Sequence, residues 1–177
     1  MEAAHPTKPV LRIGAPGDAL SVAALAIQVF LDTYATEGIR SDLAREAFNE
    51  YSAVKFEERL ADPTRLFILA EREGHLLGFA EVSLLHTRPN AHTPAGQELI
   101  RLYVQPAFQR KGIGSALLRS AELHCASLQA QTLWLTAWAG NQRALHFYRA
   151  CGYHDVGATS YVLEGNAYEN RILVKQL

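Results

Sequence analysis

The chain has 177 residues, of which 49% are hydrophobic and 20% are charged, and its formal net charge is -1. These values are typical of one folded globular domain and exclude a largely disordered chain. The near-zero charge argues against nucleic acid as a partner, because binding a polyanion calls for a basic face. We therefore expect a single domain over residues 1–177.

Membrane and secretion signals are not recognisable in the sequence. The longest apolar stretch, residues 19–31, is shorter than the roughly 18 apolar residues that a membrane span needs. Residues 1–10 contain two prolines and no apolar core, unlike a secretory signal. The two cysteines, Cys125 and Cys151, are expected to be free thiols. These observations predict a soluble, cytoplasmic protein without a membrane partner.

Hydrophobic periodicity predicts strands and helices in a mixed order. In chain order we expect a strand at 10–13, helices at 20–34 and 41–60, strands at 65–72, 76–86 and 98–104, a helix at 113–128, a strand at 132–138, a helix at 141–151 and strands at 153–163 and 168–174. This order indicates the α/β (α+β mixed) class, with about four helices covering a mixed, mostly antiparallel sheet of about seven strands. Residues 98–138 form a strand–helix–strand unit, which predicts a parallel crossover.

Turn and capping residues support these boundaries. Ser41 or Asp42 is a candidate cap for the second helix, which Pro63 ends. Residues 87–96 form a loop rich in proline, asparagine and glycine, and Gly152 closes the last helix.

The most informative segment for function is residues 109–114, Gln-Arg-Lys-Gly-Ile-Gly, between a strand and a helix. Gly112 and Gly114 allow positive φ angles and close approach of a ligand to the backbone. Successive amides at a helix N-terminus bind anions, and Arg110 and Lys111 add two positive charges. A pyrophosphate would suit this place, although a plain glycine-rich turn is the ordinary alternative. The spacing matches neither a Walker loop nor a dinucleotide fingerprint.

Two motifs together resemble those of the GCN5-related N-acetyltransferase (GNAT) family. The loop matches the family's Gln/Arg-x-x-Gly-x-Gly/Ala pattern at Gln109, Gly112 and Gly114. Residues 141–153 match its second signature, Asn-x-x-Ala-x-x-Phe-Tyr-x-x-x-Gly-Phe/Tyr, at Asn141, Ala144, Phe147, Tyr148, Gly152 and Tyr153. The predicted order of elements also agrees with the GNAT fold over essentially the whole chain.

The resemblance implies an enzyme that transfers an acetyl group from acetyl-CoA, as cosubstrate, directly to a primary amine. It implies a binding site for acetyl-CoA along the strand before the loop, the loop itself and the following helices. The residues so implied are Leu102, Tyr103, Val104, Gln109, Arg110, Lys111, Gly112, Ile113, Gly114, Ser115, Asn141 and Tyr148.

Glu98 is the candidate general base. An alkylamine with a pKa near that of lysine, about 10.4, is almost all ammonium at neutral pH and must lose a proton before it attacks. Glu98 begins the strand before the loop, where some members of the family carry a carboxylate base. A solvated glutamate at a strand edge is the alternative, and other members of the family use water chains.

Tyr148 is the candidate general acid for the departing thiolate. Asn141, Ala144, Tyr148 and Cys151 share one helical face, so Tyr148 would lie on the same side as a cofactor contact from Asn141. A core tyrosine and a helix-capping asparagine are the alternatives. The resemblance also implies that a backbone amide at Tyr103 or Val104 stabilises the developing oxyanion.

The acceptor is the least determined feature. Residues 30–34 resemble members that acetylate polyamines or other small amines, and Asp32, Glu37 and Asp42 could attract a cation. We expect a small amine such as spermidine, with a protein N-terminus or an amino acid as the alternative. An acetyl-CoA-binding module without catalysis and a protein-interaction domain also remain open. The C-terminal hairpin offers an edge for a homodimer, and no zinc site is expected around His86 and His92.

Overall fold

The computed structural model describes residues 8–87 and 94–177. The strands are β1 (Val10–Ile13), β2 (Arg65–Arg72), β3 (His75–Thr87), β4 (Gly96–Val104), β5 (Thr132–Trp138), β6 (His154–Leu163) and β7 (Asn166–Gln176). The α-helices are α1 (Ala19–Tyr34), α2 (Ser41–Glu50), α3 (Ala53–Ala61), α4 (Ile113–Ser127) and α5 (Gln142–Ala150). Short 3-10 turns at Pro16–Asp18 and Pro106–Phe108 precede α1 and α4. Most of the predicted loop at 87–96, including His92, lies outside the described residues.

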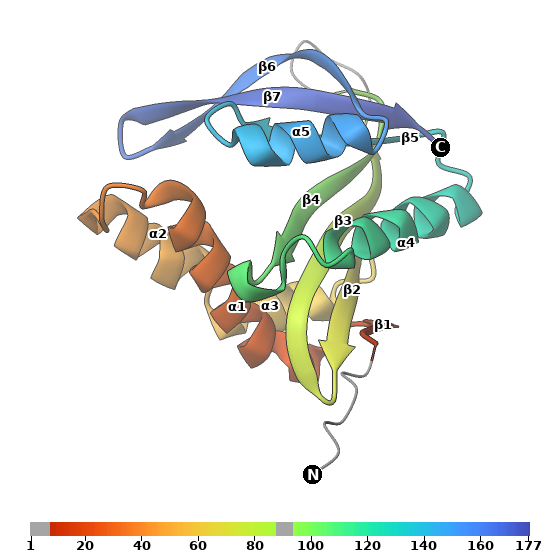
Figure 1. Ribbon diagram of the computed structural model, residues 1–177, viewed down its shortest axis with the longest axis horizontal. Coiled ribbons are helices and arrows are strands. Elements are labelled where there is room, and N and C mark those ends of the chain that lie inside the picture. Colours follow the sequence, from red (N-terminus) through yellow and green to blue (C-terminus); the bar gives the residue numbers. More distant parts are fainter. Residues whose placement is uncertain (1–7, 88–93) are drawn as a thin grey trace.

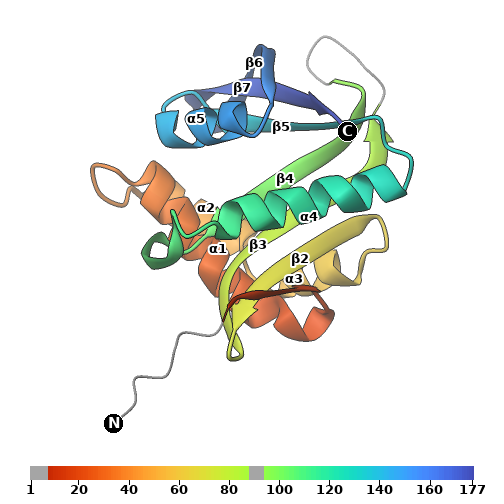
Figure 2. The same cartoon turned by 45° about the vertical axis from the view of Figure 1, so that its right-hand side comes forward.

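All seven strands form one sheet in the order β1-β2-β3-β4-β5-β7-β6 (Figures 1 and 2). Every neighbouring pair is antiparallel except β4 and β5, which are parallel. Helix α4 packs on one face against β2, β3 and β4, while α1 and α3 pack on the other. The predicted mixed, mostly antiparallel sheet and the parallel β4–β5 pair are therefore confirmed.

Side chains that alternate between the two faces of the sheet divide the core into two clusters. Ile68, Val82 and Leu99 join α4 and α5 on one face, whereas Phe67, Leu69 and Phe79 join α1, α2 and α3 on the other. Successive residues of a strand point to opposite faces, so apolar runs in β2 and β3 supply both clusters. None of the helices in the described ranges is long and apolar enough to cross a membrane.

The second predicted helix, residues 41–60, is wrong as a single element. Helix α2 ends at Glu50, and α3 begins at Ala53 after Ser52 adopts an extended backbone and accepts a hydrogen bond from the Lys55 amide at 3.4 Å. A serine that bonds to the backbone in this way starts a new helix. The described chain thus has five α-helices where about four were expected. The predicted cap is also wrong, because Arg40 occupies the N-cap position of α2.

Strand β4 separates from β5 almost as soon as they pair. Their ladder consists of Gln97 opposite Leu133 and Glu98 opposite Trp134. A β-bulge follows in β4, because Arg101 and Leu99 face consecutive residues of β3 and Ile100 has no partner there. The two strands then diverge, and this divergence positions the site described below.

We expect Gly78→Ala to destabilise the fold at the β3–β4 contact. An added Cβ at Gly78 would lie 2.6 Å from the carbonyl oxygen of Tyr103 and 3.1 Å from the Cα of Val104. Overpacking of this kind costs about 1–3 kcal/mol of unfolding free energy, measurable by urea denaturation. Gly17→Ala is the matched control, because a Cβ there meets nothing within 4 Å. Equal stability of the two variants would contradict the expectation.

Candidate active site

A cavity of about 1110 Å³ lies where β4 and β5 diverge. Its walls come from α1 and α2 on one side and from α5 on the other, with β4, β5 and the loop before α4 between them. Leu99 to Val104 of β4 all line it. Beyond Glu98, this edge of β4 therefore faces the cavity instead of a neighbouring strand.

The glycine-containing loop forms one end of the cavity. Gly112 is the N-cap of α4 with φ 80°, and Arg110 has φ 58°. No side chain in the described part of the chain caps α4, so the amides of its first turn are available to an anion. The side chain of Gln109 donates a hydrogen bond to the carbonyl oxygen of Val104 at 3.0 Å, which ties the loop to the end of β4.

Most of the predicted cofactor residues meet at this cavity. The residues that line it are Leu102, Tyr103, Val104, Gln109, Arg110, Gly112, Gly114, Ser115, Asn141 and Tyr148. Lys111 and Ile113 do not line it. The Lys111 ammonium donates to the carbonyl oxygen of Ala107 at 2.9 Å, and the Ile113 side chain is buried in the core. The Ile113 side chain is therefore unavailable to a ligand, and its backbone amide remains the candidate for a phosphate contact.

Gly114 differs from the expectation in its conformation. Gly112 has a positive φ, but Gly114 lies in the first turn of α4 and is not among the residues with positive φ. A Cβ at Gly114 would lie 3.7 Å from the Phe147 ring, in ordinary contact. The benefit of glycine at position 114 is therefore the space it leaves between the loop and α5.

Tyr148, the candidate general acid, lies in the wall of the cavity. It is 8% exposed and packs against the rings of Phe147 and Tyr153. Burial raises the pKa of its hydroxyl, and Tyr103 and Cys151 contribute in the same direction. The hydroxyl therefore stays protonated at neutral pH, as a proton donor must.

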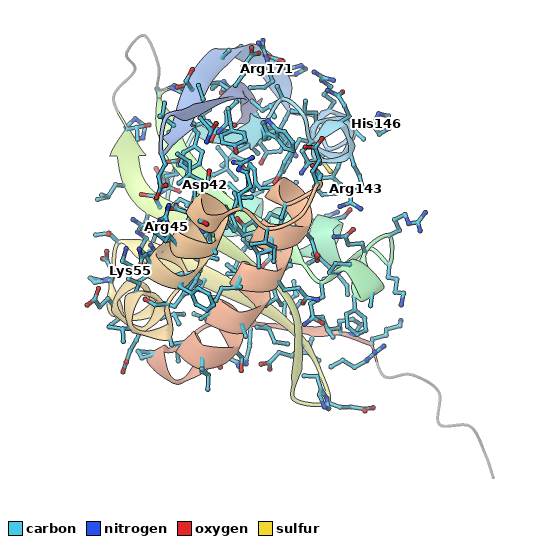
Figure 3. The ribbon with its side chains drawn as sticks, turned by 90° about the vertical axis from the view of Figure 1, so that its left-hand side faces the viewer. Asp42, Arg45, Lys55, Arg143, His146 and Arg171 are labelled. Atoms are coloured by element: carbon cyan, nitrogen blue, oxygen red, sulfur yellow. The ribbon has the colours of Figure 1, made fainter. Side chains whose placement is uncertain are left out.

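Asn141 caps α5 and also lies in the wall of the cavity. Its side-chain oxygen accepts a hydrogen bond from the Ala144 amide at 3.1 Å, so it caps α5. It also lines the cavity. The same helix contributes Arg143 and His146 to the cavity wall, and Figure 3 shows both on α5.

Glu98 does not line the cavity. It is partly buried at the start of β4, paired in the sheet with Ser83 and Trp134. Burial raises the pKa of its carboxyl group, the negative charge of Glu81 adds to this, and Arg65 and Arg101 oppose it. The bulge at Ile100 places Glu98 and Arg101 on the same face of the sheet, because their partners Ser83 and Glu81 are two residues apart.

The opposite end of the cavity contains residues that the sequence motifs did not identify. Tyr34, Tyr51, Tyr161 and Trp138 line it, together with Tyr103. They come from five separate elements or junctions between elements, so no local pattern could group them. Three carboxylates also line the cavity, namely Asp32, Glu46 and Glu50.

The prediction that three acidic residues could attract a cationic acceptor is corrected in part. Of Asp32, Glu37 and Asp42, only Asp32 lines the cavity. Asp42 is 7% exposed and paired with the Arg40 guanidinium at 2.8 Å, which lowers the pKa of its carboxyl group to about 2. Glu37 is exposed in the segment between α1 and α2.

A buried ion cluster borders this end of the cavity, opposite the loop, which is called the acceptor end below. Glu81 is fully buried and pairs with Arg65 at 2.8 Å and with Arg101. Arg101 lies 5.2 Å from the centre of the Tyr51 ring and 3.8 Å from Glu50. Although burial acts in the other direction, Lys55, Arg59 and Arg101 together lower the pKa of Glu50. Glu50 is thus an ionised carboxylate with its charge already balanced.

The family model described as Acetyltransferase (GNAT) family matches residues 33–153, which include β4, the loop and α5. The chain belongs to this family. GNAT enzymes use acetyl-CoA, so the protein is an acetyl-CoA-dependent N-acetyltransferase, as the motifs predicted. The first-turn amides of α4, together with Arg110 and Arg143 in the cavity wall, fit its phosphate groups.

Three similar proteins illustrate the range of the family. The chain is 34% identical over 102 residues to the N-alpha-acetyltransferase RimI of Mycobacterium tuberculosis, covering 58% of this chain and 60% of RimI. It is 28% identical over 156 residues to the aminoglycoside N(6')-acetyltransferase type 1 of Stenotrophomonas maltophilia, covering 86% and 91%. The crystal structure of PaiA N-acetyltransferase from Thermoplasma acidophilum in complex with coenzyme A superposes with a TM-score of 0.75 at 21% identity, covering 97% and 100%. This likeness confirms the predicted fold.

We expect Gly114→Val to weaken acetyl-CoA binding. The branched side chain would enter the space between the loop and the Phe147 ring. The dissociation constant, measured by calorimetry, should rise by about tenfold or more, equivalent to about 1.4 kcal/mol. Ala116→Val is the matched control, since Ala116 is exposed on the same helix and does not line the cavity. A dissociation constant of the Gly114 variant within about twofold of the parent's would contradict the assignment of the loop to phosphate binding.

Proposed function

We propose that the enzyme acetylates a primary amine of a small molecule, with a polyamine such as spermidine as the best single candidate. The observation that carries this proposal is that one cavity joins the anion-binding loop to an end lined by aromatic rings and by Asp32, Glu46 and Glu50. Carboxylates and aromatic faces both favour a cationic alkylamine. We further propose that residues 1–177 act as one catalytic domain.

The chain's own groups divide the reaction between the two ends of the cavity. Acetyl-CoA supplies the thioester. The loop over residues 109–114 and Ser115 hold its phosphates, and the backbone of Leu102 and Val104 runs beside its pantetheine arm, with Asn141 as a further contact. An amide of Tyr103 or Val104 stabilises negative charge on the carbonyl oxygen. Tyr148 donates a proton to the departing sulfur.

Glu98 takes the proton from the acceptor through water. The cavity lining begins at Leu99, so the carboxylate needs a relay to reach a bound amine. Its raised pKa makes it a stronger base than an exposed glutamate. Removing the ammonium proton is required before the nitrogen can attack the thioester.

A protein N-terminus is the second candidate acceptor. The specific observation in its favour is the 34% identity over 102 residues to RimI, an N-alpha-acetyltransferase. The likeness to the aminoglycoside N(6')-acetyltransferase, which extends over 86% of the chain, supports a small amine instead. Measuring thiol release from acetyl-CoA with polyamines, aminoglycosides, amino acids and peptides separates the candidates. Thiol release with peptides alone would overturn the small-molecule proposal.

Cytoplasmic location and a homodimer remain predictions. The hairpin of β6 and β7 ends the sheet, and β6 is its outer strand. This free edge is where a second copy would pair.

We expect Tyr148→Phe to lower kcat by about 10²- to 10⁴-fold, the usual range for loss of a general acid. The KM for acetyl-CoA should change little, because the variant removes only the hydroxyl group. Tyr153→Phe is the matched control. Its hydroxyl donates to Glu122 at 3.2 Å, and it does not line the cavity. An unchanged kcat under conditions where chemistry limits the rate would exclude Tyr148 as the acid.

We expect the defect of Glu98→Gln to shrink as pH rises. At high pH more of the amine arrives already deprotonated, so the enzyme needs its base less. The measurement is kcat/KM for the amine from neutral to alkaline pH, compared with the parent enzyme. A defect that stays constant across this range would assign Glu98 a structural role.

A further inference from the structure

The three carboxylates of the acceptor end differ in their partners. Glu50 is paired with Lys55 at 2.8 Å and also with Arg59 and Arg101. Asp32 and Glu46 form no ion pair with any described residue. The negative charge of Glu50 is therefore compensated by these cations. Asp32 and Glu46 leave two uncompensated negative charges in the wall of the cavity.

Glu46 is held in place by a residue that is distant in the sequence. The hydroxyl of Tyr161, on β6, donates to its Oε1 at 2.7 Å. Helix α2 also contacts the β6–β7 hairpin through Arg40 with Tyr168, Asn166 with Asp42, and Arg45 with Glu164. Figure 3 shows Asp42 and Arg45 on α2. These contacts position Glu46, and its Oε2 has no hydrogen-bond partner among the described residues.

The surroundings of these charges suit an alkyl chain with ammonium groups. Tyr34 and Trp138, with ring centres 5.4 Å apart, line the same cavity. Asn170 lines it as well, and its Oδ1 is buried without a hydrogen-bond donor in the described structure. Aromatic faces accept both methylene groups and cations, and an unpaired buried acceptor calls for an N–H donor.

We propose that Glu46, positioned by Tyr161, and Asp32 select acceptors that carry a second positive charge beyond the amine that reacts. This inference rests on the proposed function and adds the specificity-determining residues to it. A monoamine of the same length satisfies the reaction but leaves these carboxylates without a partner. A diamine or polyamine neutralises them while its other end is acetylated.

The test compares butane-1,4-diamine with butylamine, which differ by the second amine. We expect the parent enzyme to favour the diamine by about tenfold or more in kcat/KM. Glu46→Gln, which keeps the shape and an acceptor for Tyr161, should reduce this ratio by about fivefold or more, mainly through the KM for the diamine. Tyr161→Phe should reduce the ratio less than Glu46→Gln does, because it removes the hydrogen bond that positions the Glu46 carboxylate but keeps its charge.

Asp32→Asn provides an independent variant, because Asp32 is exposed and its replacement does not disturb a buried pair. Glu37→Gln is the matched control, since it removes the same charge outside the cavity and should leave the ratio unchanged. A parent enzyme without preference for the diamine, or an unchanged ratio in both Glu46→Gln and Asp32→Asn, would overturn the inference. Thiol release with butylamine in those same assays would show that acetyl transfer itself stands. No thiol release with any amine would overturn the proposed function.

Discussion

Beyond Gln97 and Glu98, strand β4 pairs with no described strand on the side of β5. In a continuous sheet the backbone groups along that edge would pair with the next strand. Here the divergence leaves them facing a cavity. Side chains from α1 and α2 and from α5 line this cavity together with β4. The bulge at Ile100 contributes, because it changes the order in which side chains alternate. The site therefore depends on an interruption in hydrogen bonding between strands.

Charge is distributed unevenly along this cavity. The loop before α4 contributes free amides and Arg110, and α5 contributes Arg143, so the donor end favours anions. Carboxylates and tyrosine rings from α1, α2 and β6 line the acceptor end. One cavity thus combines an end that favours anions with an end lined by carboxylates. Tyr148 lies in the wall of the same cavity, with its hydroxyl kept protonated by burial.

The buried cluster around Glu81 explains how the acceptor end keeps its shape. A buried carboxylate costs several kcal/mol unless it is paired, and Glu81 pairs with both Arg65 and Arg101. Arg101 in turn contacts Glu50 and lies against Tyr51. Removing both arginines would leave the buried carboxylate of Glu81 unpaired. The cluster consequently links β2, β3 and β4 to the end of α2.

Sequence alone determined the features that depend on neighbouring residues. Hydrophobic periodicity located the strands and most helices, and glycine at position 112 predicted the left-handed turn that begins α4. The spacing of Asn141 and Tyr148 placed both on one helical face in the cavity wall. The break between α2 and α3 was missed, because the apolar spacing continues through Ser52 while its side chain bonds to the backbone instead.

Tertiary structure decided the features that depend on distant residues. Glu46 and Tyr161 are 115 positions apart and meet only because α2 packs beside the β6–β7 hairpin. Glu98 stays outside the cavity lining because it lies where β4 and β5 are still paired, a matter of register that the strand's own pattern does not encode. Whether a carboxylate is balanced, as in Glu50, or uncompensated, as in Asp32, likewise depends on which distant cations reach it. Local sequence specifies backbone conformation through short-range sterics and hydrogen bonds, whereas charge environment and cavity walls arise only when separate elements pack together.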